Sequence, residues 1–140
     1  MESAHSAYRK SKATSLTRID MLIALYDRTL KTLNAGIESQ QSGDDNGFIS
    51  AQLTAYRCIL ALLDGIDADR DEVSANIQRL CLFAASRILE GTTGSWQDAI
   101  KVLQPLHNSF VQIREEAVQL ELNGQIPALN FQSVVEHSVV

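Results

Sequence analysis

A run of alternating aspartates in this 140-residue chain is a candidate metal site. Asp67, Asp69 and Asp71 have the spacing of the first ligands in a calcium-binding loop. Such a loop also needs Gly at its sixth position and Glu at its twelfth, but those positions hold Glu72 and Gln78. The pattern therefore predicts a solvated acidic link rather than a calcium site.

Two other patterns resemble metal or phosphate sites, and each lacks residues that such a site requires. Glu2 and His5 have the Glu-x-x-His spacing of di-iron ligands, but a di-iron bundle needs acidic ligands on all four helices, and this pair lies near the N-terminus. Residues 91–94, Gly-Thr-Thr-Gly, lack the Lys of a phosphate-binding loop and follow a helical pattern. We expect no metal, no cofactor and no catalytic residues, and therefore no enzyme.

His107 is a candidate phosphoacceptor, because a four-helix bundle with one exposed histidine is typical of phosphotransfer modules in two-component signalling. In those modules a Lys-Gly pair follows the histidine, whereas Asn108 and Ser109 follow here. His107 comes directly after Leu106, at the edge of an apolar stripe, which favours a histidine at the boundary of the core. A regulatory bundle with His107 as acceptor is the alternative function.

Composition and charge exclude several classes of protein. Hydrophobic residues make up 45% and charged residues 21%, which are ordinary values for one globular domain. The net charge of −5 argues against nucleic-acid binding, although residues 1–18 alone are basic. No apolar run reaches 18 residues, so we expect no membrane insertion. Cys58 and Cys81 are widely spaced, which suits two buried thiols in a reducing compartment better than a disulfide.

Apolar residues recur in alternating steps of three and four over four segments, which predicts helices with one apolar side. The four segments are residues 17–43, 48–66, 73–91 and 95–123. Short links make neighbours antiparallel, and a near-3.5 period favours a left-handed bundle. The predicted fold class is all-α: an antiparallel left-handed four-helix bundle over residues 17–124, with a flexible N-terminal arm over 1–16 and a C-terminal tail over 125–140.

Helix-capping pairs mark two of the predicted starts. Thr17 with Asp20 opens the first segment, and Ser95 with Asp98 opens the fourth, because each pair can satisfy two free backbone amides. Pro105 lies inside the fourth segment, where it removes one backbone hydrogen bond. We expect a kink near residues 101–105 rather than a break.

The predicted helices carry more apolar residues than a bundle interior needs, which is about three in seven. We expect the stripe of the second segment to face the core; its members are Ile49, Leu53, Tyr56, Leu60 and Leu63, and Ile59 and Leu62 widen it. The surplus beside the main stripes of the first two segments is Leu22, Leu25, Leu62 and Ile66. This surplus can be covered by the arm or the tail, pack against a second copy in a homodimer, or bind an apolar helical partner.

Several stretches together resemble the FliS family of flagellin-specific export chaperones. The arm contains a Tyr, the first helix contains Leu-Tyr-Asp, and the third helix opens with a Glu-Ile-Ala-x-Asn-Leu-like run in which Leu80 and Phe83 follow in step. The resemblance covers about residues 8–120. Arg18, Cys81 and Ser86 depart from the family pattern, which affects the partner contacts more than the fold.

The resemblance implies a cytosolic chaperone that wraps the disordered C-terminal segment of flagellin in apolar grooves and releases it at the export gate, a component of which would be a second partner. Covering this segment prevents premature polymerisation and keeps flagellin competent for type III export. No catalysis or nucleotide is needed. Together with the surplus residues, the resemblance predicts these partner-binding residues: Tyr8, Leu22, Leu25, Tyr26, Asp27, Leu62, Ile66, Asn76, Leu80 and Arg87. Tyr8 matches the arm residue that folds over the empty groove in the family.

Overall fold

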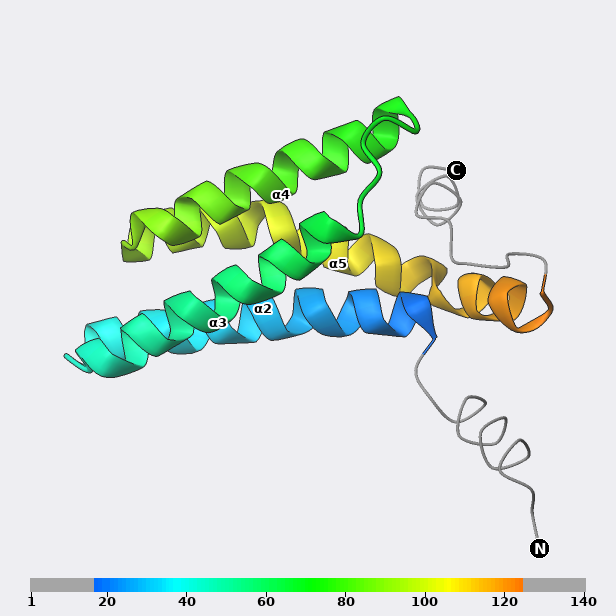
Figure 1. Ribbon diagram of the computed structural model, residues 1–140. Helices are drawn as coiled ribbons and strands as arrows, with labels where there is room; N and C mark the ends of the chain where they lie inside the picture. The colour runs from blue at the N-terminus through cyan, green and yellow to red at the C-terminus, as the bar shows by residue number, and fades with distance from the viewer. Residues whose placement is uncertain (1–16, 125–140) are drawn as a thin grey trace, which may run out of the picture.

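The computed structural model describes residues 17–124, and the predicted arm with Tyr8 and the predicted tail lie outside this part of the chain. The four predicted helices are confirmed within it, and Figure 1 shows them running alternately in opposite directions. Their bounds are α2 Arg18–Gln41, α3 Asp45–Asp64, α4 Glu72–Glu90 and α5 Thr93–Leu122. The sense of the superhelical twist stays a prediction.

Each helix packs against two neighbours, so the bundle is a closed ring of four. Helix α2 contacts α3 and α5, and α4 contacts the same two helices from the other side. The diagonal helices meet through long side chains inside the ring. Tyr26 of α2 lies 3.8 Å from the sulfur of Cys81 on α4, and Phe48 of α3 stacks on Trp96 of α5 with ring centroids 4.2 Å apart. The core therefore joins all four helices.

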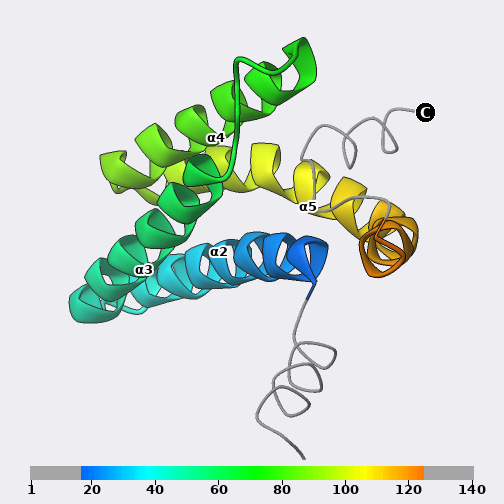
Figure 2. The same ribbon diagram turned by 45° about the vertical axis from the view of Figure 1, so that its right-hand side comes forward.

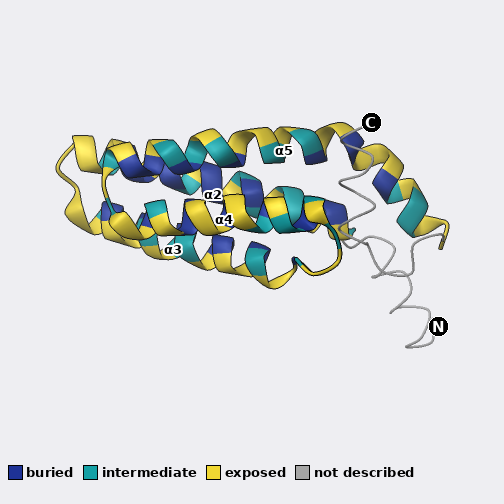
Figure 3. Ribbon diagram, turned by 90° about the horizontal axis from the view of Figure 1, so that it is seen from above, coloured by how far each residue is buried: buried dark blue, intermediate teal, exposed yellow. Residues whose placement is uncertain are grey.

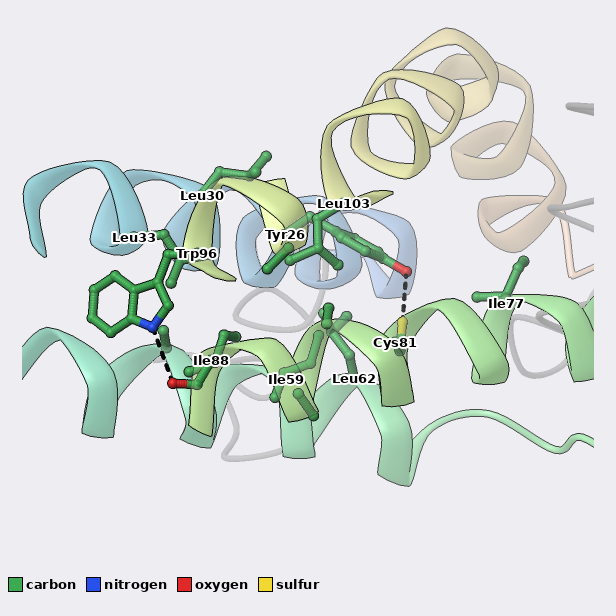
Figure 4. Close-up of a cluster of buried hydrophobic side chains, with 14 of the residues drawn as sticks. Tyr26, Leu30, Leu33, Ile59, Leu62, Ile77, Cys81, Ile88, Trp96 and Leu103 are labelled. Atoms are coloured by element: carbon green, nitrogen blue, oxygen red, sulfur yellow. Dashed lines mark hydrogen bonds between the residues drawn. The ribbon is translucent and has the colours of Figure 1, made fainter. Parts of the chain in front are cut away.

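Two aromatic groups fill the core at different levels, as Figure 4 shows in part. At one level Tyr26 stacks on Phe110, with ring centroids 5.5 Å apart. At the other, Trp96 is fully buried, and its Nε1 donates a hydrogen bond to the carbonyl of Ile88 at 3.0 Å. Gly36 makes room for this indole, because a Cβ at position 36 would overlap the ring and lie 2.8 Å from the Cβ of Ala51.

Polar side chains cap the helix starts. The predicted cap at Thr17 is confirmed, since its hydroxyl accepts from the Asp20 amide at 3.4 Å. The predicted cap at Ser95 with Asp98 is wrong. Thr92 caps α5, and Ser95 is its reciprocal partner three residues later, so the helix begins at Thr93. Two adjacent threonines and a serine offer overlapping capping patterns, and the sequence alone does not choose between them.

The second predicted helix also begins earlier than expected. The sequence places its start at Phe48, after a glycine-rich stop, but Asp44 caps α3 through the Gly47 amide at 2.9 Å and the helix begins at Asp45. Helix α5 continues through Pro105, as expected, and its C-terminal part points away from the line of its first half (Figure 2).

Polar contacts hold α4 to its neighbours near its C-terminal end. Besides the Trp96 bond, Gln52 of α3 donates to the carbonyl of Ile88 at 2.9 Å. Arg87 pairs with Asp98 of α5 at 2.8 Å. At the other end, residues 65–71 connect α3 to α4, and Figure 2 shows this end of α4 standing away from α2. Helix α4 is therefore anchored by polar groups at one end.

An ion pair between Asp20 and Arg114 joins the start of α2 to α5, with 2.5 Å between Nε and Oδ1. The hydrogen bond from Arg114 lowers the pKa of Asp20 below its ordinary value. Because the folded-state pKa lies below the unfolded one, the pair stabilises the fold above about pH 4, and this is lost as pH falls through the folded-state pKa. We expect Arg114→Ala to lower the free energy of unfolding at pH 7 by a small amount, as is typical of a solvent-exposed ion pair.

Urea denaturation at pH 7 and at pH 2.5 checks this expectation. The difference between the wild type and Arg114→Ala should shrink at the lower pH, because protonation of Asp20 removes the charge that Arg114 pairs with. An unchanged difference would show that Arg114 acts through packing rather than through its charge.

Candidate functional site

Ten large hydrophobic side chains are exposed within residues 17–124, and seven of them belong to α3 and α4. Figure 3 shows exposed positions along the outer sides of the helices. Isolated exposed hydrophobic residues are normal, but a contiguous group marks an interaction surface. The seven on α3 and α4 are Ile49, Leu53, Leu60, Leu80, Leu82, Phe83 and Leu89.

Helix α3 carries a continuous apolar stripe beside its buried side. Ile49 is 61% exposed, Leu53 51% and Leu60 44%, and the half-buried Tyr56 and Leu63 complete the alternating spacing. Gln52, on the same side of α3 as Tyr56 by helical spacing, reaches the carbonyl of Ile88, so this side is the one next to α4.

This observation corrects the predicted core of the second helix. Three members of the stripe expected to face the interior, Ile49, Leu53 and Leu60, are exposed. Helix α3 instead buries a side rotated from it: Phe48, Ala51, Ala55, Cys58, Ile59, Leu62 and Ile66. Small residues at this contact let α3 approach α2, as the position of Gly36 against Ala51 shows. The larger residues of the predicted stripe are left outside because the contact has no room for them.

Helix α4 presents apolar residues on both sides of its buried strip. Arg87 pairs with Asp98 of α5, and Leu80 and Phe83 lie seven and four residues before it, so all three share the side facing α5. Leu82 and Leu89, seven residues apart, lie on the opposite side, toward α3.

These positions define two surfaces. We call Ile49, Leu53, Leu60, Leu82 and Leu89 the α3/α4 face, and Leu80 with Phe83 the α4/α5 face. Both are formed by apolar side chains with no reactive group among them. Such surfaces can bind another apolar chain.

Comparison with known proteins identifies the family of this chain. The family model described as flagellar protein FliS matches residues 1–117. The chain belongs to the FliS family. By its family it is a flagellin export chaperone that acts in the cytoplasm and is not an enzyme. No curated protein and no solved structure matches the chain.

The structure places the partner-binding residues predicted from the resemblance to FliS at different depths. Leu22 and Leu25 are half-buried and pack against the core. Tyr26, Leu62 and Ile66 are buried in the core. A partner would reach these last three only by separating the helices, so their direct contact with flagellin stays a prediction that requires such a movement.

The remaining predicted residues of this FliS family member are closer to solvent. Asp27 pairs with Lys31 one turn later at 2.9 Å. Asn76 is exposed, and Leu80 is 38% exposed. Arg87 is half-buried in its pair with Asp98. Of the ten predicted residues, Leu80 is the one large hydrophobic residue that is exposed within residues 17–124.

Neither metal nor membrane features appear in the described part of the chain. Within residues 17–124, no three His, Cys, Asp or Glu side chains gather as metal ligands. None of the four described helices is long and apolar enough to cross a membrane. His107, the alternative phosphoacceptor, is half-buried on α5, and its Nδ1 lies 3.5 Å from Oδ1 of Asn108.

Both cysteines are buried free thiols, as the sequence suggested. Burial raises the pKa of Cys81 to about 11, with the contact to Tyr26 acting in the opposite direction. Roughly one Cys81 thiol in a thousand is therefore ionised at pH 8. Because the thiolate is the nucleophile, we expect iodoacetamide to alkylate Cys81 about a hundredfold more slowly in the folded protein than in urea.

Peptide mapping by mass spectrometry after timed alkylation measures this rate for Cys81 separately from Cys58. The same reaction in urea provides the control. Equal rates in buffer and in urea would contradict the buried position of Cys81.

Proposed function

We propose that this FliS chaperone binds the C-terminal segment of flagellin mainly on the α3/α4 face. The observation that carries the proposal is the apolar stripe of α3 on the side next to α4, in which Ile49, Leu53 and Leu60 stay exposed. Leu82 and Leu89 extend the same apolar surface onto α4. A flagellin segment that folds as an amphipathic helix presents a complementary apolar side at the same spacing.

The dimensions of the stripe fit such a ligand. Residues 49 and 63 are separated by 14 positions, which corresponds to about 21 Å at 1.5 Å per residue. A bound helix of about four turns would cover this length. Each half-exposed Leu or Ile contributes about 1 kcal/mol when its burial is completed, and the ordering of the disordered ligand offsets part of that sum. We expect an affinity that holds flagellin in the cytoplasm and still permits release.

The α4/α5 face provides a second group of proposed contacts. Leu80, Asn76 and Arg87 lie on this side of α4, and the sequence resemblance assigns all three to partner binding. In this proposal the flagellin segment continues from the α3/α4 face around α4. Arg87 would give a polar contact at the edge of that path.

Calorimetric titration with a flagellin C-terminal peptide tests the proposed function. We expect a 1:1 complex and a negative heat-capacity change, the sign of apolar surface being buried. A peptide of the same composition in scrambled order is the matched control. If the native-order peptide gives neither heat nor co-elution at micromolar concentrations, the proposed function is wrong.

A further inference from the structure

Exposed arginines lie on the outward ridges of α3 and α4, one on each helix. Arg57 follows the fully buried Ala55 by two residues, and Arg79 precedes the fully buried Cys81 by two. Two residues correspond to about half a turn, so each arginine lies opposite the buried side of its helix. The α3/α4 face occupies the surface between these two ridges. Each of its long edges therefore carries a positive charge.

The same arginines lie next to exposed apolar residues of the face. Arg57 comes four residues after Leu53 and three before Leu60, so it is a surface neighbour of both on α3. Arg79 comes three residues before Leu82 on α4. A helix that covers these leucines must pass beside both guanidinium groups.

The two arginines also lie at similar levels along the face. The hydrogen bond from Gln52 to the carbonyl of Ile88 aligns the antiparallel helices, so Arg57 lies opposite about Phe83. Arg79 is four residues from Phe83, or about 6 Å at 1.5 Å per residue. A helix bound between the ridges would therefore meet both arginines within about one of its turns.

Neither arginine uses its charge inside the bundle. Among residues 17–124 no carboxylate forms an ion pair with Arg57 or Arg79, and Arg79 donates to the uncharged side chain of Asn76. Acidic residues lie toward the ends of the face, at Asp45 and Asp64 of α3 and Glu90 of α4. The middle of the face therefore attracts carboxylates, and its ends do not.

We propose that Arg57 and Arg79 select an amphipathic helix that carries carboxylates on both sides of its apolar stripe, near its middle. This inference rests on the proposed function and adds the chemistry of the partner segment. The apolar side of the partner covers Leu53, Leu60 and Leu82, and its flanking Asp or Glu side chains pair with the arginines at the two edges. Charges at the edge of an apolar interface act mainly on specificity, so a helix with lysines at the same positions is repelled.

Two designed peptides test this selection without use of a flagellin sequence. Each is a helix of about 15 residues with leucines three and four positions apart, and the central flanking positions hold Glu in one peptide and Lys in the other. Fluorescence anisotropy of the labelled peptides measures both affinities for the full-length chain. We expect the Glu peptide to bind at least about fivefold more tightly. The difference should shrink in about 1 M salt, where the Debye length falls to about 3 Å.

The double variant Arg57→Glu with Arg79→Glu should reverse the preference toward the Lys peptide. Arg28→Glu with Lys101→Glu is the matched control, because both positions are exposed on α2 and α5 and the change in net charge is the same. We expect this control to keep the preference for the Glu peptide. Thermal melts followed by circular dichroism check that all the proteins are folded.

The inference is wrong if the wild type binds neither designed peptide or binds both equally, or if the two double variants shift the preference alike. The flagellin peptide separates this inference from the proposed function. If that peptide binds the wild type and the Arg57→Glu, Arg79→Glu variant with equal affinity, the selection by arginines is wrong and the proposed function stands.

Discussion

Replacing Trp96 by alanine should lower the free energy of unfolding by about 3–5 kcal/mol, a large part of the stability of a domain of this size. The indole is fully buried, stacks on Phe48 at 4.2 Å and donates to the carbonyl of Ile88. Its removal leaves a cavity beside Gly36, which has no side chain to fill the space. The Ile88 carbonyl also loses a bond from outside its own helix.

Urea denaturation followed by far-ultraviolet circular dichroism measures this loss, since the substitution removes the one tryptophan of the chain. Trp96→Phe is the control. It keeps a ring against Phe48 and loses the hydrogen bond, so it should cost less than Trp96→Ala. A Trp96→Ala protein within 1 kcal/mol of the wild type would contradict the central role of this residue.

The double variant Leu53→Asp with Leu60→Asp should weaken binding of the flagellin C-terminal peptide by at least tenfold, or about 1.4 kcal/mol. Both side chains are about half exposed on the α3/α4 face, and a carboxylate there must lose water when an apolar helix covers it. The folded bundle does not bury either position, so the melting temperature should change little.

Ser50→Asp with Ala61→Asp is the matched control for this variant. These two exposed positions are on α3 but outside the apolar stripe, and the change in net charge is the same. We expect the control to bind like the wild type. Equal affinities for the two double variants, with both proteins folded, would place the flagellin site elsewhere on the bundle.

The fold was predictable from the sequence because the helix signals are local. The alternating stripe of the first helix, from Ile19 to Ile37, faces the core as expected, with Ile23 half-buried. Glycine and capping residues mark most of the helix ends within a few positions. Where several capping residues adjoin, as at Thr92 and Ser95, the local signal was ambiguous and the predicted start was wrong.

The buried side of α3 was not predictable in the same way, because it depends on how closely α2 and α3 approach. Large residues made the exposed stripe look like the core, whereas the buried side of α3 contains the small residues Ala51 and Ala55, and Ala51 lies against Gly36 of α2. One signal was available: a glycine inside a helix, such as Gly36, often marks a close approach between helices. The same glycine explains why Trp96, which the periodicity analysis did not select, is the largest fully buried side chain.

The sequence correctly indicated that the helices carry more apolar residues than the core buries, but it placed the exposed ones at the wrong positions of α3. Leu62 and Ile66 belong to the core, and the exposed surplus lies at Ile49, Leu53 and Leu60. Helical periodicity identifies an apolar side of a helix. It cannot decide which of two apolar sides, about a third of a turn apart, is buried. That choice depends on tertiary packing.

The polar anchors of α4 give this helix a pivot. Its bonds to Gln52, Trp96 and Asp98 all involve Arg87 or Ile88, near the C-terminal end of the helix. The side of α4 that faces the core includes small buried residues such as Ser74 and Ala84. A swing of the Glu72 end would break apolar contacts and the Tyr26–Cys81 contact, whereas the bonds of Arg87 and Ile88 lie at the opposite end of the helix. Such a movement of α4 would expose the core around Tyr26 and Leu62 while the C-terminal end of α4 stays attached to α3 and α5.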